Sequence, residues 1–348
     1  MTCISGATNS WARSSACRTR AEPVPGDRSG GGGSALLADI GGTNARFALA
    51  GADGAPGAVS VLSCDDFPGL AEAAESFLQA SAPASRPSQA AVAVASPVTG
   101  DEIRLTNRRW SFSIEALRTR LGLARLEVVN DFTAVAHAIP RLGPADRIQV
   151  GGGEPAEGTP VAVIGPGTGL GVSGLVPDSG GNWTALATEG GHVTLPATDA
   201  REMAVIDYLR GRYEHVSAER VLSGPGLVNL YEALARIEAR DAETLTPPEI
   251  TARALLGDDP LCVGAVELFC AFLGTVAGDL ALSLGARGGV WIAGGIVPRL
   301  GDAFVASPFR VRFEAKGRFE GYMKAIPSWV VTHRYPAFPG LAALLAPD

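Results

Sequence analysis

Residues 36–50 constrain this chain most, because they join two short apolar runs through the pair Gly41-Gly42. We predict a tight hairpin whose turn requires positive φ and leaves backbone N–H groups uncovered, as in proteins that cradle a phosphate. Asp39 ends the first run and would repel that phosphate unless a cation came between them. The stretch therefore suggests a Mg·nucleotide site. The alternative is an ordinary hairpin with a solvated Asp39 and an exposed Arg46.

Length and composition narrow the class of protein. The chain has 348 residues, 46% of them hydrophobic, which allows a sizeable core and favours two domains over one. The net charge of −7 argues against a nucleic-acid or anionic-membrane partner. Its five cysteines form no Cys-x-x-Cys pair and no zinc-type cluster with histidine. Such scattered thiols fit a reduced, cytoplasmic protein.

Residues 1–34 differ from the rest of the chain. Four arginines stand among Ser, Thr, Pro and Gly, and the segment ends in the linker-like run 29–34. It contains no apolar core of a secretory signal, and Glu22 and Asp27 count against a transit peptide. We expect a disordered N-terminal extension and exclude it from the fold.

A second strand-turn-strand unit repeats the scheme of the first. The apolar run 161–164 enters the glycine-rich turn 165–171, and a strand resumes over 172–176, with Thr168 in the place that Thr43 holds in the first unit. A third glycine turn, Gly294-Gly295, ends the apolar run 289–293. We predict a duplicated β-β-β-α-β-α-β-α layout with phosphate turns facing each other across a cleft.

One long apolar run, 261–284, has the length of a membrane span. Glu267 and Asp279 fall inside it, and a charge near the centre of a bilayer is costly. We therefore predict a buried helix of a soluble core.

Polar residues follow a further predicted strand. The run 126–129 stops at Asn130-Asp131, and residues 132–139 show a helical pattern. Side chains at the carboxyl end of a parallel strand stand where open α/β sheets bind ligands. The sequence thus indicates a ligand site at Asn130 and Asp131.

The chain contains neither a Walker A sequence nor G-x-G-x-x-G. Residues 39–44, 167–169 and 293–295 instead match the phosphate-1, phosphate-2 and adenosine motifs of the sugar kinase/actin/heat-shock-chaperone superfamily. Within it, the chain closely resembles the bacterial hexokinase-like glucokinases. The stretches that carry this resemblance are 130–134, 167–171, 189–192, 215–226 and 293–298.

The resemblance covers nearly all of residues 35–348 and implies a two-lobed actin-like ATPase (ribonuclease H-like) α/β fold with an interlobe cleft. The small lobe would comprise residues 35–141 with 332–348, and the large lobe residues 142–331. The implied activity is ATP-dependent phosphorylation of D-glucose at O6, with Asp131 as general base. The alternative for Asp131 is that it caps the helix that follows it.

The resemblance also implies the binding residues. The glucose hydroxyls would be bound by Asn130, Asp131, Glu189, His192 and Glu219, whose carboxylates and imidazole suit vicinal diols. The alternative for His192 is a loop histidine bonded to backbone. Asp39 would orient Mg²⁺ through water. The nucleotide would be bound by Asp39, Gly41, Gly42, Thr43, Asn44, Gly167, Thr168, Gly169, Gly294 and Gly295. Ser223 and Gly224 either border the nucleotide or belong to a helix cap.

Several points stay open at this stage. The acceptor could be mannose, fructose or an amino sugar, the donor could be ADP or polyphosphate, and the protein could be a sugar-sensing regulator that does not turn over.

The zinc signature C-x-C-G-x-x-G-C-x-E of the related repressor/open-reading-frame/kinase group is missing, so we expect no structural zinc. The closing helix 339–345 is plainer than the family's glycine-rich equivalent. The resemblance suggests a homodimer.

Overall fold

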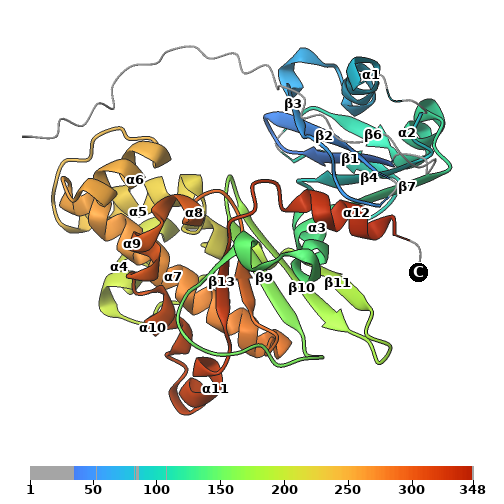
Figure 1. The fold of residues 1–348 in the computed structure, drawn as a ribbon. Coiled ribbons are helices and arrows are strands. Elements are labelled where there is room, and N and C mark those ends of the chain that lie inside the picture. Colours follow the sequence, from blue (N-terminus) through green and yellow to red (C-terminus); the bar gives the residue numbers. More distant parts are fainter. Residues whose placement is uncertain (1–34, 52, 82, 84–85, 107, 347–348) are drawn as a thin grey trace, which may run out of the picture. The chain divides into compact units, whose positions relative to one another are not determined.

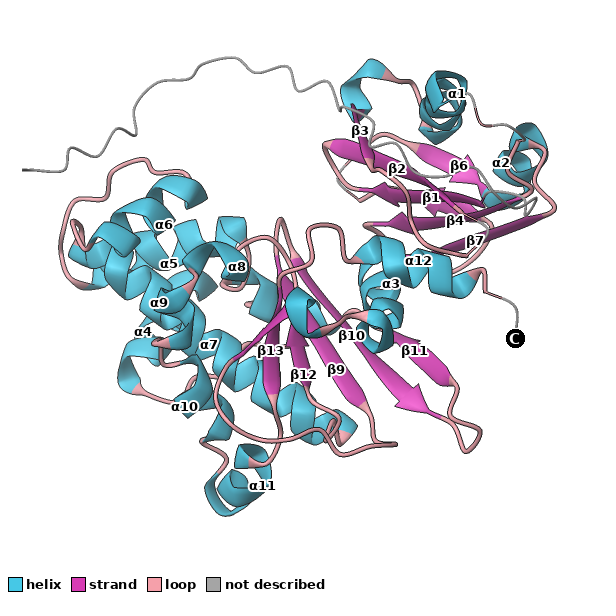
Figure 2. Ribbon diagram, viewed as in Figure 1, coloured by secondary structure: helices cyan, strands magenta, loops and turns pink. Residues whose placement is uncertain are grey.

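The structure is a computed structural model that describes residues 35–51, 53–81, 83, 86–106 and 108–346. The prediction for residues 1–34 lies outside the described residues. Two larger sheets and their covering helices account for most of the described chain (Figure 2).

The first sheet has the strand order β3-β2-β1-β4-β7. Its strands are β1 (Ala35–Ile40), β2 (Asn44–Ala50), β3 (Ser60–Ser63), β4 (Gln89–Val94) and β7 (Arg125–Asn130). The strands β1, β4 and β7 are parallel, whereas β2 pairs antiparallel with both β1 and β3 and so completes a meander. Helices α1 (Leu70–Ser81) and α2 (Ile114–Leu121) share one apolar core with this sheet, where Phe77 stacks on Phe47 at 5.3 Å between ring centroids. The short ribbon β5 (Glu102–Arg104) and β6 (Ser111–Ser113) leads into α2.

The second sheet repeats this arrangement and adds one strand, in the order β11-β10-β9-β12-β13-β8. Its strands are β8 (Arg147–Gln149), β9 (Val161–Pro166), β10 (Leu170–Pro177), β11 (Trp183–Ala187), β12 (Val290–Ile292) and β13 (Ser328–Val331). Here β9, β12 and β13 are parallel, and β10 and β11 form the antiparallel meander. The predicted duplication is therefore confirmed, and β8 is an unpredicted addition that pairs antiparallel with β13.

The remaining helices are α3 (Asp131–Ala138), α4 (Ala200–Arg210), α5 (Gly224–Ile237), α6 (Pro247–Leu256), α7 (Pro260–Leu284), α8 (Val297–Leu300), α9 (Asp302–Val305), α10 (Phe309–Glu314), α11 (Glu320–Lys324) and α12 (Ala337–Leu344). Helices α4 to α11 share one apolar core with the second sheet. Short 3₁₀ turns are η1 (Cys64–Asp66), η2 (Ile139–Arg141), η3 (Pro144–Asp146), η4 (Gly190–His192), η5 (Ala218–Arg220) and η6 (Gly317–Phe319).

Helix α7 contains the long apolar run 261–284. Among the described helices it alone is long and apolar enough to cross a membrane, and 83% of its most apolar window is buried within the protein. It packs against α5, α6 and α10 (Figure 1). This burial is that of a core helix, as predicted.

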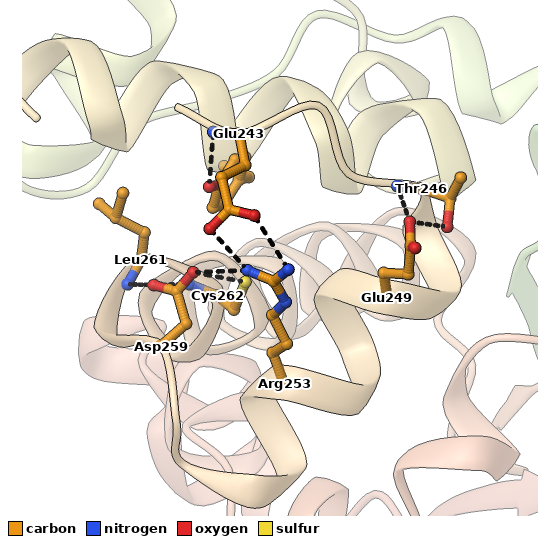
Figure 3. Close-up of polar contacts among 8 residues, drawn as sticks. Glu243, Thr246, Glu249, Arg253, Asp259, Leu261 and Cys262 are labelled. Atoms are coloured by element: carbon orange, nitrogen blue, oxygen red, sulfur yellow. Dashed lines mark hydrogen bonds and ion pairs between the residues drawn. The ribbon is translucent and has the colours of Figure 1, made fainter. Parts of the chain in front are cut away.

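Side-chain caps define where α6 and α7 begin (Figure 3). Thr246 donates its backbone N–H and its hydroxyl to Glu249 at 2.8 and 2.6 Å, which closes a capping box for α6. Arg253 of α6 forms a two-pronged bond to Glu243 at 2.9 and 3.0 Å and lies 3.9 Å from Asp259, the N-cap of α7. These contacts join the two helices at one corner.

Helices α3 and α12 occupy equivalent places in the two repeats, each after the last parallel strand of its sheet. They pack on each other (Figure 1) and share an apolar cluster with strands of both sheets. Their approach is very close, because a Cβ at Gly340 of α12 would lie 1.8 Å from the carbonyl oxygen of Ala134 in α3. Glycine at this one position of the closing helix permits the contact.

Candidate active site

The first glycine turn joins β1 to β2 as predicted, but it does not use the predicted backbone conformation. Neither Gly41 nor Gly42 is among the described glycines with positive φ, and three residues, 41–43, span the strands. Two of the turn's carbonyls are bonded by other parts of the chain: Arg108 Nε donates to Gly42 O at 2.7 Å, and Cys64 N donates to Thr43 O at 2.9 Å. The N–H groups of Gly42 and Thr43 bond to no described residue and are available for a phosphate.

Asp39, the last but one residue of β1, is paired with Arg46 of β2. The two residues face each other across the hairpin, and Arg46 Nη1 donates to Asp39 Oδ2 at 3.0 Å. Burial raises the pKa of Asp39, and the charge of Arg46 opposes that shift. The alternative, a solvated Asp39 and an exposed Arg46, is therefore wrong.

Asn130 and Asp131 lie at the carboxyl end of β7, where α3 begins. Asn130 is the N-cap, and its Oδ1 accepts the backbone N–H groups of Phe132 at 2.9 Å and Thr133 at 3.3 Å. The alternative that Asp131 caps this helix is thus wrong: Asp131 is its first residue, and its Oδ1 accepts the neighbouring N–H of Phe132, at 2.9 Å.

The carboxyl of Asp131 has an unusual proton affinity. Burial is the main cause and the nearby charge of Asp39 the second, and together they raise its pKa from 3.8 to about 7. The hydrogen bond from Phe132 opposes this shift. A carboxyl that titrates near neutral pH can accept a proton from a hydroxyl and release it again.

Phe132 attaches the start of α3 to the second sheet. A Cβ on Gly165 of β9 would lie 2.5 Å from the Phe132 ring, and one on Gly171 of β10 would lie 1.8 Å from it. These two glycines are paired in the register of β9 and β10, so the ring rests on bare backbone. Phe132 thereby positions the neighbouring Asp131.

The second and third glycine turns lie next to each other at the end of β9. In the second turn, which contains Thr168, Gly167 N donates to Gly169 O at 2.8 Å, and a Cβ on Gly167 would meet open space. In the third turn, Gly294 has φ +83°, and its Cβ position lies 2.3 Å from Pro166 O. Gly295 is open on its Cβ side.

The predicted sugar residues line two cavities rather than one. Asn130 and Glu189 line a cavity of about 290 Å³, whereas His192 and Glu219 line one of about 360 Å³. Asp131 lines neither of these two. The loop that carries Glu189 and His192 connects them.

That loop lies flat on the start of β10. Cβ atoms on Gly190 and Gly191 would lie 2.7 Å from Val172 Cγ1 and 2.1 Å from Leu170 O, so side chains are excluded there. The backbone oxygen of His192 accepts from His215 Nε2 at 3.1 Å. The sequence indicated the residues of this loop but not its contacts with β10 and His215.

Ser223 is the N-cap of α5. Its hydroxyl accepts from Gly226 N at 3.0 Å and donates to Glu219 O at 2.8 Å. Of the two alternatives for Ser223, the helix cap is therefore confirmed.

Sequence reasoning missed Arg108, Cys64 and Phe132. Arg108 also pairs with Asp65, and so links the first turn to the segment after β3. For Phe132 a signal existed, because glycines at paired strand positions often mark the close approach of another group. For Arg108 no local pattern marks the contact, since 66 residues separate it from Gly42.

The described residues contain no group of three or more His, Cys, Asp or Glu side chains that could hold a metal. Magnesium seldom needs one, because it commonly keeps several waters and is bound by one or two carboxylates together with substrate phosphates. Asp39 beside the first turn, with Oδ1 not engaged by Arg46, fits that pattern.

Comparisons with known proteins show which family this chain resembles. The family model described as Glucokinase matches residues 36–347. A glucokinase of Paramagnetospirillum magneticum is 57% identical over 310 residues, which are 89% of this chain and 97% of that protein. A bifunctional protein glk of Paraburkholderia xenovorans is 50% identical over 96% of this chain, which spans 52% of that longer protein.

A solved structure has a similar fold. The crystal structure of a glucokinase from an Antarctic psychrotroph is 37% identical, with a TM-score of 0.81 over 90% of this chain and 98% of that one. The duplicated α/β architecture described above is thus the sugar-kinase fold of the actin-like ATPase type. The chain belongs to the glucokinase family.

Proposed function

We propose that this protein transfers the γ-phosphoryl group of ATP to O6 of D-glucose, with Asp131 as general base. The observation that carries the proposal is the position of Asp131. It begins α3 at the carboxyl end of β7, where the charge of Asp39 acts on it, and its pKa is raised to about 7. The family membership of the chain supports the reaction class.

Each part of the reaction has a group to serve it. Asp131 accepts the proton of the sugar 6-hydroxyl as that oxygen attacks phosphorus. The N–H groups of Gly42 and Thr43, together with the turn 167–169, would bind the phosphates, and Gly294-Gly295 would leave room for the adenosine. Bound with ATP, Mg²⁺ would neutralise phosphate charge, and Asp39 would hold it through water.

Glucose would be bound by Asn130, Asp131, Glu189, His192 and Glu219. Asn130 and Glu189 line one cavity and His192 and Glu219 line another, and bringing the two cavities together would let one sugar contact all four residues. We therefore infer that sugar binding closes the lobes, taken as residues 35–141 with 332–348 and residues 142–331. Closure would exclude water, which competes with the sugar as phosphoryl acceptor.

Two properties of the whole protein belong to the same proposal. We infer a cytoplasmic location, supported by the described cysteines Cys64, Cys262 and Cys270, all of which are free thiols. We also infer a homodimer, which light scattering coupled to size-exclusion chromatography would test directly.

The test of the base compares wild type with Asp131→Asn in a coupled assay with glucose and ATP. We expect kcat to fall by about 10²- to 10⁴-fold, the usual contribution of a general base, while the dissociation constant of glucose measured by calorimetry changes little. An unchanged kcat would remove Asp131 from the role of base. A panel of mannose, fructose and amino sugars, with ADP and polyphosphate as rival donors, would identify the substrates.

A further inference from the structure

The second glycine turn is held at both ends by one segment of the chain, residues 219–224. At one end, Leu170 N donates to Glu219 Oε2 at 2.8 Å. At the other end, Gly224 N donates to Gly167 O at 2.8 Å. Ser223 ties the two holding residues together, because its hydroxyl donates to Glu219 O while it caps α5. The shape of the turn therefore depends on where Glu219 lies.

The carboxylate of Glu219 reaches the turn only because residue 169 is glycine. A Cβ on Gly169 would lie 2.4 Å from Glu219 Oε2, inside the contact distance of carbon and oxygen. On the other side of the same turn, a Cβ on Gly167 would meet no atom within 4 Å. A methyl group at position 169 must displace the carboxylate, whereas one at position 167 displaces nothing.

The same carboxylate belongs to the candidate sugar site. Glu219 lines the cavity of about 360 Å³ together with His192, and Oε1 of Glu219 bonds to no described residue. Its two oxygens therefore have separate surroundings: Oε2 is engaged by the nucleotide turn, and Oε1 is available to a sugar hydroxyl.

We propose that Glu219 is a positioning residue that couples the sugar site to the second phosphate turn. A sugar hydroxyl bound at Oε1 holds the carboxylate in place, and Oε2 then holds Leu170 N–H and the turn in the geometry that receives ATP. Since coupling between two binding sites is reciprocal, bound nucleotide also strengthens sugar binding. This inference rests on the proposed function, because it requires Glu219 to contact the sugar.

The nucleotide arm of the test measures the affinity of the full chain for AMPPNP, a non-hydrolysable ATP analogue, by calorimetry with Mg²⁺ and without sugar. Glu219→Ala removes the bond to Leu170, so we expect AMPPNP to bind about tenfold more weakly. His192→Ala is the matched control, since His192 lines the same cavity without a bond to the turn. It should weaken glucose binding and leave AMPPNP binding within about twofold of wild type.

The sugar arm measures glucose affinity without nucleotide. Gly169→Ala lies in the nucleotide turn, yet we expect it to weaken glucose binding about tenfold because its methyl group displaces the Glu219 carboxylate. Gly167→Ala, with the same added methyl group, should bind glucose as wild type does. Circular dichroism and thermal melting establish that each variant is folded, and Glu219→Gln, which keeps an oxygen for Leu170 N–H, replaces Glu219→Ala if that variant fails to fold. With Glu219→Gln, AMPPNP binding without sugar should stay near wild type while glucose strengthens it less than in wild type.

The outcomes separate this inference from the proposed function. If wild type phosphorylates glucose but Glu219→Ala binds AMPPNP as tightly as wild type, or Gly169→Ala binds glucose normally, the coupling is refuted and the proposed function stands. With the substitute Glu219→Gln, a gain in AMPPNP affinity from glucose equal to that of wild type refutes the coupling. If wild type neither binds nor phosphorylates glucose, the proposed function fails. Weaker AMPPNP binding in Glu219→Ala together with weaker glucose binding in Gly169→Ala supports the coupling.

Discussion

Catalysis that depends on Asp131 as base must follow the ionisation of that carboxyl. Burial and the charge of Asp39 raise its pKa to about 7, so roughly one tenth of the molecules carry the ionised base at pH 6 and about nine tenths at pH 8. An ordinary aspartate would be almost fully ionised at both values. We therefore expect the logarithm of kcat/KM for glucose to rise with a slope near 1 below about pH 7 and to level off above about pH 8.

The same shift predicts the pH dependence of stability, with a definite sign. In the unfolded chain Asp131 loses its proton near pH 3.8, whereas in the folded protein it keeps the proton up to about pH 7. The folded state binds more protons in this interval, so the contribution of Asp131 to the free energy of unfolding falls as pH rises from about 4 to about 7. Between pH 5 and pH 8 this loss amounts to about 2 to 3 kcal/mol.

Asp131→Asn removes this pH-dependent loss of stability, because an asparagine side chain does not titrate. Its free energy of unfolding in urea, relative to wild type, should increase by about 2 to 3 kcal/mol from pH 5 to pH 8. This measurement needs no ATP, whose terminal phosphate titrates in a similar range and complicates the kinetic profile. A difference that stays constant with pH, or a flat kinetic profile between pH 6 and pH 8, would refute the raised pKa of Asp131.

Further predictions concern packing and charge. Gly340→Ala places a methyl group 1.8 Å from the carbonyl oxygen of Ala134, so it should lower the free energy of unfolding by about 1 to 3 kcal/mol in urea titrations. Gly321→Ala in α11 is its control, because that position is open and the substitution should stabilise by about 0.5 to 1 kcal/mol; equal effects at both sites would contradict the close packing of α3 and α12. Arg46→Met leaves Asp39 without its partner and should cost about 1 to 3 kcal/mol at pH 8. The cost should be smaller at pH 5, where Asp39, whose pKa burial raises, takes up a proton more readily; a cost independent of pH would argue against the pair.

Local pattern decided most of the secondary structure that could be predicted. The glycine-separated apolar runs became β1 and β2, the run 261–284 became α7, and Ser113 caps α2 through a bond from Ala116 N at 3.0 Å. The strands β8 and β11 escaped prediction. Strand β8 has three residues, which is too short to show an alternation of apolar and polar side chains. Strand β11 lies at the edge of the sheet with mixed exposure, and it forms by pairing with β10.

By itself, the sequence determined the family, through motifs that match those of known glucokinases. It also determined the duplicated sheets and the residues placed at strand ends, because periodicity and glycine turns act over a few neighbouring residues. Only the tertiary structure decided how these residues are used. The pairing of Arg46 with Asp39, the raised pKa of Asp131 and the bond from Leu170 to Glu219 each join groups whose meeting depends on strand register or on a distant segment. Burial and electric charge act through space, and distance along the chain does not encode them.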